Sequence, residues 1–190
     1  MALHYDIARS PAHFDQILAL QQRNLLAEVD PADRATQGFV YARHTRPLLE
    51  AMAAELPQVV AIDAGRVVGY TLAMPAAMRD AIPQLVPMFG QFDRTQWRGR
   101  PLAAYRYMVG GQVCVDHAYR GRGLLRALYE ECRRRLPPEF ALCVTEVSER
   151  NAVSLRAHLK MGFETAATYV DEGDRWQILV WDLRNGAGTP

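Results

Sequence analysis

The chain has 190 residues, of which 49% are hydrophobic and 23% are charged. This is enough apolar material for one sizeable core, and it excludes a disordered or collagen-like chain. The 22 Lys and Arg residues nearly balance 21 Asp and Glu, giving a formal net charge of +1. The chain as a whole therefore offers no field for binding nucleic acid or an anionic membrane, and any basic site must be local.

No segment predicts a membrane span or a secretory leader. The longest stretches without charge, such as residues 67–78 and 81–92, are about twelve residues long, short of the roughly twenty that cross a bilayer. The first ten residues carry His4, Asp6 and Arg9 and lack the basic-then-apolar layout of a signal peptide. We therefore expect a cytoplasmic protein with no membrane partner.

The organisation along the chain is simple. No repeat, low-complexity tract or linker-like run interrupts the sequence, which predicts a single domain over residues 1–184, with a loose tail at 185–190. Three cysteines, Cys114, Cys132 and Cys143, lie in apolar segments without C-x-x-C spacing. They are interpreted as buried thiols, and no metal site is expected.

The first elements have clear signals. Alternation over residues 3–7 predicts a strand, and Ser10-Pro11 supplies a cap and a first-turn proline for a helix that stops near Asp30-Pro31. The apolar stripe of this helix is Phe14, Ile17, Leu18, Gln21 and Leu25. A second helix is expected over 46–56. The run 59–74, broken at Ala64-Gly65, predicts two antiparallel strands.

Residues 75–101 show no clean period and are interpreted as an insertion. Their large apolar side chains could line an acceptor pocket or a dimer contact, although core filling is the commoner role. These side chains are Met78, Leu85, Met88, Phe89, Phe92 and Trp97.

The second half alternates strands and helices. Strands are predicted over 105–115 and 140–147, helices over 123–135 and 151–161, and a last hairpin over 165–170 and 175–182. The resulting order, β-α-α-β-β-β-α-β-α-β-β, predicts an α/β fold with a central mixed sheet of about seven strands flanked by helices. The β-α-β segment implies a parallel pair with a right-handed crossover.

The sharpest motif is a strand that runs through a Gly/Arg loop into a helix. Gly121 and Gly123 lack a Cβ, so their backbone N–H groups can turn toward a ligand, while the helix N-terminus adds partial positive charge. Residues 120–135 also hold six Arg against Glu130 and Glu131. The loop predicts an anion cradle suited to pyrophosphate, although it could also be an ordinary turn with solvated arginines.

A second constellation lies on the later helix. Asn151, Ser154 and His158 stand at i, i+3 and i+7 and share one face, whereas Leu155 and Leu159 are offset toward a neighbouring apolar face. The polar stripe suggests the wall of a cleft. The alternatives are an N-cap for Asn151, a neutral small residue for Ser154 and a surface histidine for His158.

Together the two constellations resemble the GNAT superfamily of acyl-CoA-dependent N-acetyltransferases. The resemblance covers residues 113–163. The family pattern Q/R-x-x-G-x-G/A corresponds to Arg120-x-x-Gly123-x-Leu125, with Leu125 departing from the small final residue. It implies that acetyl-CoA binds here. No nucleic-acid partner is expected, because the charge is balanced and no aromatic side chains are interleaved with the basic ones. The implied coenzyme-binding residues are Val113, Cys114, Val115, Arg120, Gly121, Arg122, Gly123, Leu124, Leu125, Asn151 and Ser154.

The resemblance also implies two catalytic roles. The position of His158 is usually Tyr in the family and protonates the departing thiolate; a histidine could do the same or only hydrogen-bond the sulfur or the coenzyme. Glu146, at the end of a strand, is the best candidate for the base, since ligands gather at the carboxyl ends of strands and an apolar cleft raises a carboxyl pKa. The alternative for Glu146 is an exposed carboxylate at the end of a strand. Asp116, His117 and Glu149 are weaker candidates for the base.

Three further expectations complete this interpretation. Gln112 could orient a water or the substrate, and Gly110-Gly111 could mark a bulge that parts the parallel strands. The acceptor is expected to be a primary amine of a small molecule or peptide that attacks the thioester directly, since no local motif supports a covalent intermediate. A non-catalytic acyl-CoA-binding module is the alternative, and a homodimer is possible.

Overall fold

The computed structural model describes residues 3–184, and the predicted loose tail at 185–190 lies outside this range. The described chain forms two compact units. The first comprises residues 3–74 and 110–136, and the second comprises 75–109 and 137–184. The single domain expected over 1–184 stays a prediction. Within the described part of the chain, no helix has both the length and the apolar character of a membrane span.

The strand order is β1-β2-β3-β6-β7-β9-β8, parallel between β6 and β7 and antiparallel in the pairs β1–β2, β2–β3, β7–β9 and β8–β9. The expected α/β fold with a central mixed sheet of about seven strands is therefore confirmed. The strands are β1 (His4–Ile7), β2 (Val59–Asp63), β3 (Arg66–Pro75), β6 (Tyr107–Val115), β7 (Leu142–Ser148), β8 (Glu164–Asp171) and β9 (Asp174–Asp182). The parallel ladder is short: it joins Tyr107–Val109 to Leu142–Val144 and ends just before Gly110-Gly111.

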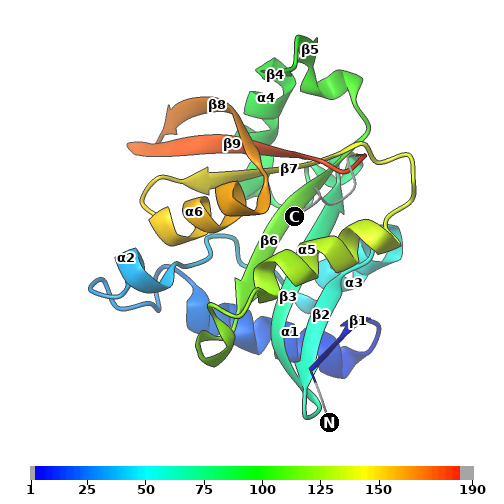
Figure 1. The fold of residues 1–190 in the computed structure, drawn as a ribbon, viewed down its shortest axis with the longest axis vertical. Helices are drawn as coiled ribbons and strands as arrows, with labels where there is room; N and C mark the ends of the chain where they lie inside the picture. Colours follow the sequence, from blue (N-terminus) through cyan, green and yellow to red (C-terminus); the bar gives the residue numbers. More distant parts are fainter. Residues whose placement is uncertain (1–2, 185–190) are drawn as a thin grey trace. The chain divides into compact units, whose positions relative to one another are not determined.

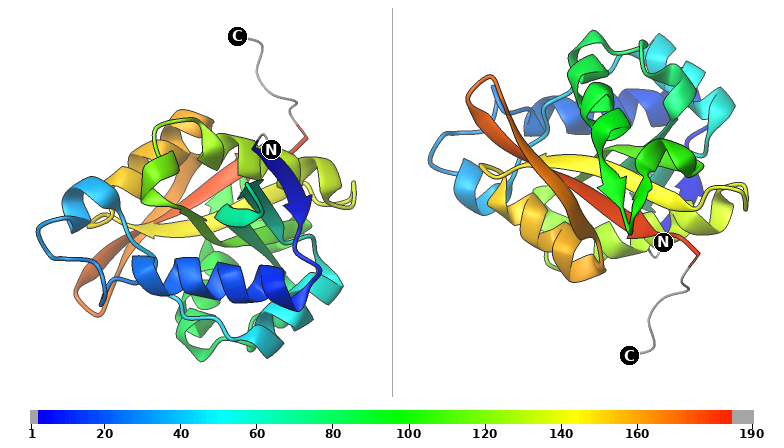
Figure 2. Two further views of the ribbon diagram at one scale, coloured as in Figure 1. Left: turned by 90° about the horizontal axis from the view of Figure 1, so that it is seen from below. Right: turned by 90° about the horizontal axis from the view of Figure 1, so that it is seen from above.

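The first unit places its helices on two faces of its strands. Helices α1 (Pro11–Asn24) and α3 (Arg46–Glu55) lie on one face, and α5 (Leu124–Arg135) lies on the other (Figures 1 and 2). A single turn, α2 (Arg34–Gln37), separates α1 from α3. The Ser10 and Thr45 side chains cap α1 and α3 by accepting from the backbone N–H groups of His13 and Leu48.

Helix α1 departs from the prediction in two respects. It ends at Asn24 instead of near Asp30, and the Asn24 side chain donates to the Leu20 carbonyl at 2.8 Å. The buried stripe is also rotated, because Leu20 is buried where Leu18 was expected.

The second unit has α6 (Ala152–Met161) on one face of β7, β9 and β8, and α4 (Val86–Arg94) on the other (Figure 2). The sequence did not predict α4, because Pro87 and the absence of a clean apolar period masked its helical pattern. Pro87 falls in the first turn, where its missing N–H costs nothing.

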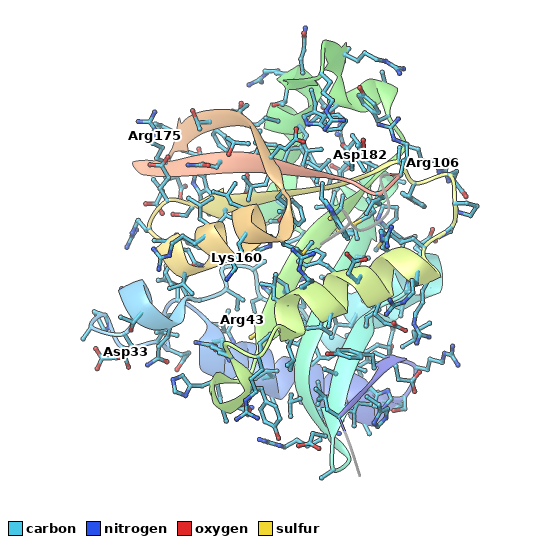
Figure 3. The ribbon with its side chains drawn as sticks, in the orientation of Figure 1. Asp33, Arg43, Arg106, Lys160, Arg175 and Asp182 are labelled. Atoms are coloured by element: carbon cyan, nitrogen blue, oxygen red, sulfur yellow. The ribbon has the colours of Figure 1, made fainter. Side chains whose placement is uncertain are left out.

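The insertion contributes to the core of the second unit. Met88, Phe89 and Phe92 of α4, together with Trp97, are buried, so these side chains fill the core rather than line an open pocket. A short hairpin of β4 (Gln96–Trp97) and β5 (Arg100–Pro101) follows α4. Arg98 in its turn pairs with Asp182 at 3.3 Å. Asp182, which is labelled in Figure 3, is the last residue of β9.

Candidate active site

The Gly/Arg loop of the first unit has the backbone that its glycines predict. Gly121 and Gly123 adopt φ values of +71° and +80°, a region that side chains rarely enter. A Cβ added at either position would meet open space. Helix α5 begins at Leu124 directly after Gly123, which supplies no side chain to cap the first-turn N–H groups. The loop and helix end therefore fit an anionic group such as a phosphate.

Two side chains anchor this loop. Arg120 turns away from the glycines: its Nε donates to the Val115 carbonyl at 3.0 Å, one Nη donates to Asn24 Oδ1 at 2.6 Å, and the other donates to the Gln37 carbonyl. The Tyr119 hydroxyl donates to Asp63 at 2.6 Å, at the end of β2. These contacts tie the loop to β6, α1, α2 and β2.

The positive charge of residues 120–135 is concentrated at the loop. Toward the end of α5, Arg133 pairs with Glu130 and Arg135 pairs with Glu131. No Asp or Glu occurs between residues 120 and 129, a stretch that holds three of the six arginines. All three hydrogen bonds of Arg120 go to neutral oxygens, so its charge is not cancelled by a carboxylate there. Both features favour an anion near the loop.

Toward the end of β6, the strand that leads into the loop, the burial of successive side chains alternates. Cys114 is buried, and Val113 and Val115 are half-buried. Burial raises the pKa of Cys114 to about 12, and burial raises the pKa of Cys132 to about 12 as well. Cys143 is also buried. The prediction of buried thiols is confirmed, and near neutral pH Cys114 and Cys132 are protonated and poor nucleophiles.

Gln112 is committed to a buried network within the first unit. Its Oε1 accepts from Gln21 Nε2 and from the Tyr70 hydroxyl, both at 2.7 Å, and its Nε2 donates to the Ala42 carbonyl at 2.8 Å. His44 Nδ1 accepts from the same Gln21 amide at 2.9 Å. These bonds connect α1, β3, β6 and the segment before α3. Gln112 thus stabilises the first unit, which weakens the expectation that it orients a substrate.

In the second unit, Glu146 lies half-buried on β7 and accepts a hydrogen bond from the Tyr169 hydroxyl of β8. Burial raises the pKa of Glu146 to about 7, although the bond from Tyr169 acts in the opposite direction. A carboxylate with such a pKa is half-ionised near neutral pH and can both take up and release a proton.

Strand register assigns Glu146 to a defined face. Glu146 lies opposite Ile178 of β9, which lies opposite Ala167 of β8, and Tyr169 lies opposite Trp176. Directly paired residues project to the same side of a sheet. We call this side the Glu146 face; it consists of Glu146 and Ser148 on β7, Trp176 and Ile178 on β9, and Ala167 and Tyr169 on β8.

Helix α6 packs on the opposite face. His158 stacks edge-on against Phe163, with ring centroids 5.1 Å apart, and Phe163 contacts Trp181, with centroids 5.9 Å apart. Trp181 is paired with Cys143, and because side chains alternate along a strand, both project to the side of the sheet opposite Glu146. Glu146 and His158 are therefore on different sides of β7 and β9.

His158 is only 2% exposed, so the alternative of a surface histidine is wrong. Its Nδ1–H donates to the Ser154 carbonyl at 2.8 Å, and burial lowers its pKa. Leu159, expected on an apolar face, is instead 42% exposed. The polar stripe thus faces inward at His158 and not toward solvent.

The other residues predicted on this helix have structural contacts. Asn151 is the N-cap, and its Oδ1 accepts from the Ser154 N–H at 3.4 Å. Ser154 is half-buried, and its hydroxyl lies 3.4 Å from His158 Nδ1. The N-cap alternative for Asn151 is confirmed.

The weaker candidates for the base are engaged elsewhere. Asp116 accepts from the Ala118 N–H at 3.1 Å and pairs with Arg66 at 3.4 Å. Glu149 is exposed and accepts from Gln177 Nε2 at 3.0 Å. His117 is exposed in the turn before the loop. Glu149 and His117 thus lack the half-buried setting of Glu146, and Asp116, which is half-buried, is paired with an arginine.

The contact of Tyr169 with Glu146 is not predictable from the sequence. In a regular strand, Thr165 and Tyr169 would share a face, because side chains alternate with a period of two. The register shifts between Thr165 and Ala167, so Ala166 is an extra residue that moves Tyr169 to the other face. The alternating pattern carries no signal for this bulge.

Comparison with known proteins identifies the family. The model of the acetyltransferase (GNAT) family matches residues 23–163, more than half of the chain. The chain belongs to this family. A search of curated protein sequences gave no significant match.

Solved structures share the GNAT fold with this chain. A putative acetyltransferase, YncA, from Salmonella typhimurium, solved with acetyl-CoA, has 18% identity and a TM-score of 0.62, covering 100% of this chain and 99% of its own. NAA60 of Arabidopsis thaliana, also with acetyl-CoA, has 12% identity and a TM-score of 0.64, covering 95% and 99%. The ribosomal-protein-S18-alanine N-acetyltransferase of Escherichia coli has 13% identity and a TM-score of 0.59, covering 96% and 94%. At these identities the likeness concerns the fold.

Proposed function

We propose that this GNAT protein is an acetyl-CoA-dependent N-acetyltransferase that transfers the acetyl group to a primary amine of a small molecule or peptide. Glu146 carries the proposal: it is the half-buried carboxylate on β7 whose pKa, raised by burial to about 7, suits proton exchange near neutral pH. An ammonium group must lose a proton before its nitrogen can attack a thioester, and Glu146 accepts that proton directly or through water.

The Gly/Arg loop would bind the pyrophosphate of coenzyme A. Its left-handed glycines, open space and exposed helix N-terminus are the supporting observations. The backbone of Val113, Cys114 and Val115 would contact the pantetheine arm, with Asn151 and Ser154 beside it. Arg122, Leu124 and Leu125 would contribute through the loop and the first turn of α5, whereas Arg120 supports the loop from behind. Acetyl-CoA supplies an activated acetyl thioester when bound.

Direct attack on the thioester is favoured over a covalent enzyme intermediate. Burial keeps Cys114 and Cys132 as thiols, since both have a pKa of about 12. With no activated thiolate among them, the simplest route forms the new N–C bond and breaks the C–S bond on one carbonyl carbon. A backbone N–H of β6 would stabilise the developing oxyanion.

His158 would contact the coenzyme. Its lowered pKa and the Nδ1–H bond to Ser154 support the hydrogen-bonding role over the role of proton donor, because the proton of the neutral ring is already committed at Nδ1. The other ring nitrogen, Nε2, can then only accept, so its partner would be an amide N–H of the coenzyme or the S–H of the product thiol. A proton-donor role would require His158 to take up a second proton inside an apolar setting.

The solved structures support the same chemistry. Two of the neighbours were solved with acetyl-CoA, and one is an N-acetyltransferase that acts on an alanine of a ribosomal protein. These neighbours favour an amine or peptide acceptor for this chain. The distribution of Glu146 and His158 on different sides of β7 and β9 is compatible with separate acceptor and thiol sides.

The test compares two glutamates close in sequence. Glu146→Gln should lower thiol release from acetyl-CoA by about 100-fold or more in the presence of an accepted amine, with little change in acetyl-CoA affinity. Glu149→Gln, which removes a similar charge from an exposed site, should retain turnover. Equal activity of both variants and the wild type would contradict the assignment of Glu146 as base.

A second candidate is a non-catalytic acyl-CoA-binding module. It is favoured by the buried histidine at a position where the family usually has tyrosine. In that case acetyl-CoA would bind, but no amine in a broad panel would release thiol. This result would favour the binding module over the transferase.

A further inference from the structure

Tyr169 reaches Glu146 because of one irregularity in β8. The extra residue Ala166 reverses the alternation, so that Tyr169 joins the Glu146 face instead of the face covered by α6. Thr165, before the bulge, remains on the α6 side and bonds to Gln177 at 3.0 Å. The bulge thus determines that a phenol, and not the neighbouring Thr168, lies beside the carboxylate.

The contact has a fixed direction. Burial, followed by the nearby charge of Glu146, raises the pKa of Tyr169 above its usual value, so the phenol stays protonated at every pH at which an enzyme of this kind would work. The phenol therefore donates and Oε2 of Glu146 accepts. A hydrogen bond to an ionised carboxylate is among the stronger ones and restricts its rotation.

We propose that Tyr169 is the positioning residue for the base: by holding Oε2 of Glu146, it presents Oε1 to the acceptor ammonium. One proton then moves from the acceptor nitrogen to Oε1, which leaves a neutral amine with a free electron pair and a protonated Glu146. This inference rests on the proposed function, because it assigns Glu146 the role of base. Tyr169 itself exchanges no proton in the step.

Other charged groups also lie on the same side of the sheet as the Glu146–Tyr169 pair. Asp171, two residues after Tyr169, raises the pKa of Glu146 through its charge. Asp174 lies on the same side but pairs with Arg150 at 3.2 Å. Farther along this side are Tyr107 with the Arg79–Asp93 pair, and Asp182 with Arg98 and Arg184. Among the described residues, Tyr169 and Asp171 are the side chains that shift the pKa of Glu146 besides burial.

The direct test is a titration that needs no substrate. Protein labelled with carbon-13 at the glutamate carboxyls is titrated by NMR, and the Glu146 signal is identified by its absence in Glu146→Gln. Tyr169→Phe should raise the apparent pKa of Glu146 by about one pH unit, since it removes a bond to the ionised form. Thr168→Val removes a neighbouring exposed hydroxyl from the other face and should leave the value unchanged.

Asp171→Asn provides a control in which the pKa of Glu146 should shift in the opposite direction. It removes a negative charge near Glu146 without touching the phenol, so the apparent pKa should fall. Melting curves establish that each variant is folded. An unchanged Glu146 pKa in folded Tyr169→Phe would overturn the proposal, as would an equal rise in Thr168→Val.

Kinetics separate this inference from the proposed function. Tyr169→Phe should move the acid limb of the kcat/KM profile to higher pH by the amount found in the titration and lower kcat about tenfold, while KM for acetyl-CoA stays constant. If no amine releases thiol with the wild type, the proposed function fails. If Glu146→Gln turns over like the wild type, the assignment of Glu146 as base fails. If Glu146→Gln is inactive but Tyr169→Phe keeps the wild-type profile and kcat, the positioning role of Tyr169 alone fails.

Discussion

His158 donates its Nδ1 proton to the backbone carbonyl of Ser154, one helical turn earlier on α6. This bond fixes the ring orientation and the neutral tautomer, because a carbonyl can only accept. Burial lowers the pKa of His158 and disfavours a second proton. The ring is therefore expected to act as a neutral hydrogen-bonding group beside the coenzyme.

Replacement of His158 tests this role. His158→Phe should lower kcat by about tenfold to 100-fold with little change in acetyl-CoA affinity, measured by steady-state kinetics and calorimetry. His158→Gln, which keeps an amide but cannot titrate in this range, should recover part of the loss. Wild-type turnover of His158→Phe at all pH values would remove His158 from the chemistry.

The anion cradle is tested with a matched pair of glycines. Gly123→Asp places a negative charge where the pyrophosphate is expected and should weaken acetyl-CoA binding by at least about 100-fold. Gly65, in the β2–β3 turn, has φ +79° and equally open surroundings. Gly65→Asp therefore carries the same backbone strain, about 1–2 kcal/mol, and the same charge. Equal affinities of the two variants in calorimetry would contradict the cradle.

The anchoring role of Arg120 gives a prediction about stability. Arg120→Ala removes three hydrogen bonds and should lower the free energy of unfolding by about 2 kcal/mol. Arg122→Ala removes the same charge from an exposed side chain whose guanidinium lies 5.3 Å from the Tyr119 ring centre. Arg122→Ala should lower the free energy of unfolding by less than about 1 kcal/mol. Denaturant titration measures both, and equal losses would show that Arg120 is no special anchor.

Glu146 should make the protein less stable as the pH rises. Its pKa of about 7 in the folded state exceeds its ordinary value of 4.5. Between these values the unfolded chain is ionised while the folded protein still holds the proton, so stability falls across this window and the penalty is complete above pH 7. Glu146→Gln cannot ionise and should be more stable than the wild type by about 1–3 kcal/mol at pH 8.

The same variant supplies its own control at low pH. At pH 4 both Glu146 and its unfolded counterpart are mostly protonated, and the advantage of Glu146→Gln should disappear. Thermal unfolding at pH 4 and pH 8 measures the difference. An advantage of equal size at both pH values would point to packing and not to ionisation.

Much of this architecture was predictable because its signals are local. The Ser10-Pro11 start of α1, the Ala64-Gly65 turn and the Gly123 start of α5 each depend on the conformational preferences of one or two residues. Helix α4 was missed because prolines and mixed apolar residues hide its period. The sequence around Glu146 identified this carboxylate as the candidate base but did not predict its hydrogen bond with Tyr169.

What the sequence could not predict arises from contacts between distant segments. The bond of Tyr169 to Glu146 depends on a bulge at Ala166, which shifts the register without altering the apolar pattern. Arg120 bonds to Asn24 and Gln37, which lie 96 and 83 positions earlier in the chain. Nothing in the loop sequence distinguishes the half-buried anchor Arg120 from the exposed Arg122.

The most direct test of the account is thermal unfolding with and without acetyl-CoA, followed in the same samples by thiol release against a panel of amines, amino acids and peptides. A ligand that binds only the folded state raises the melting temperature by mass action. We expect a clear rise in melting temperature and thiol release with at least one primary amine. No rise at saturating acetyl-CoA would contradict the central claim that this protein uses acetyl-CoA.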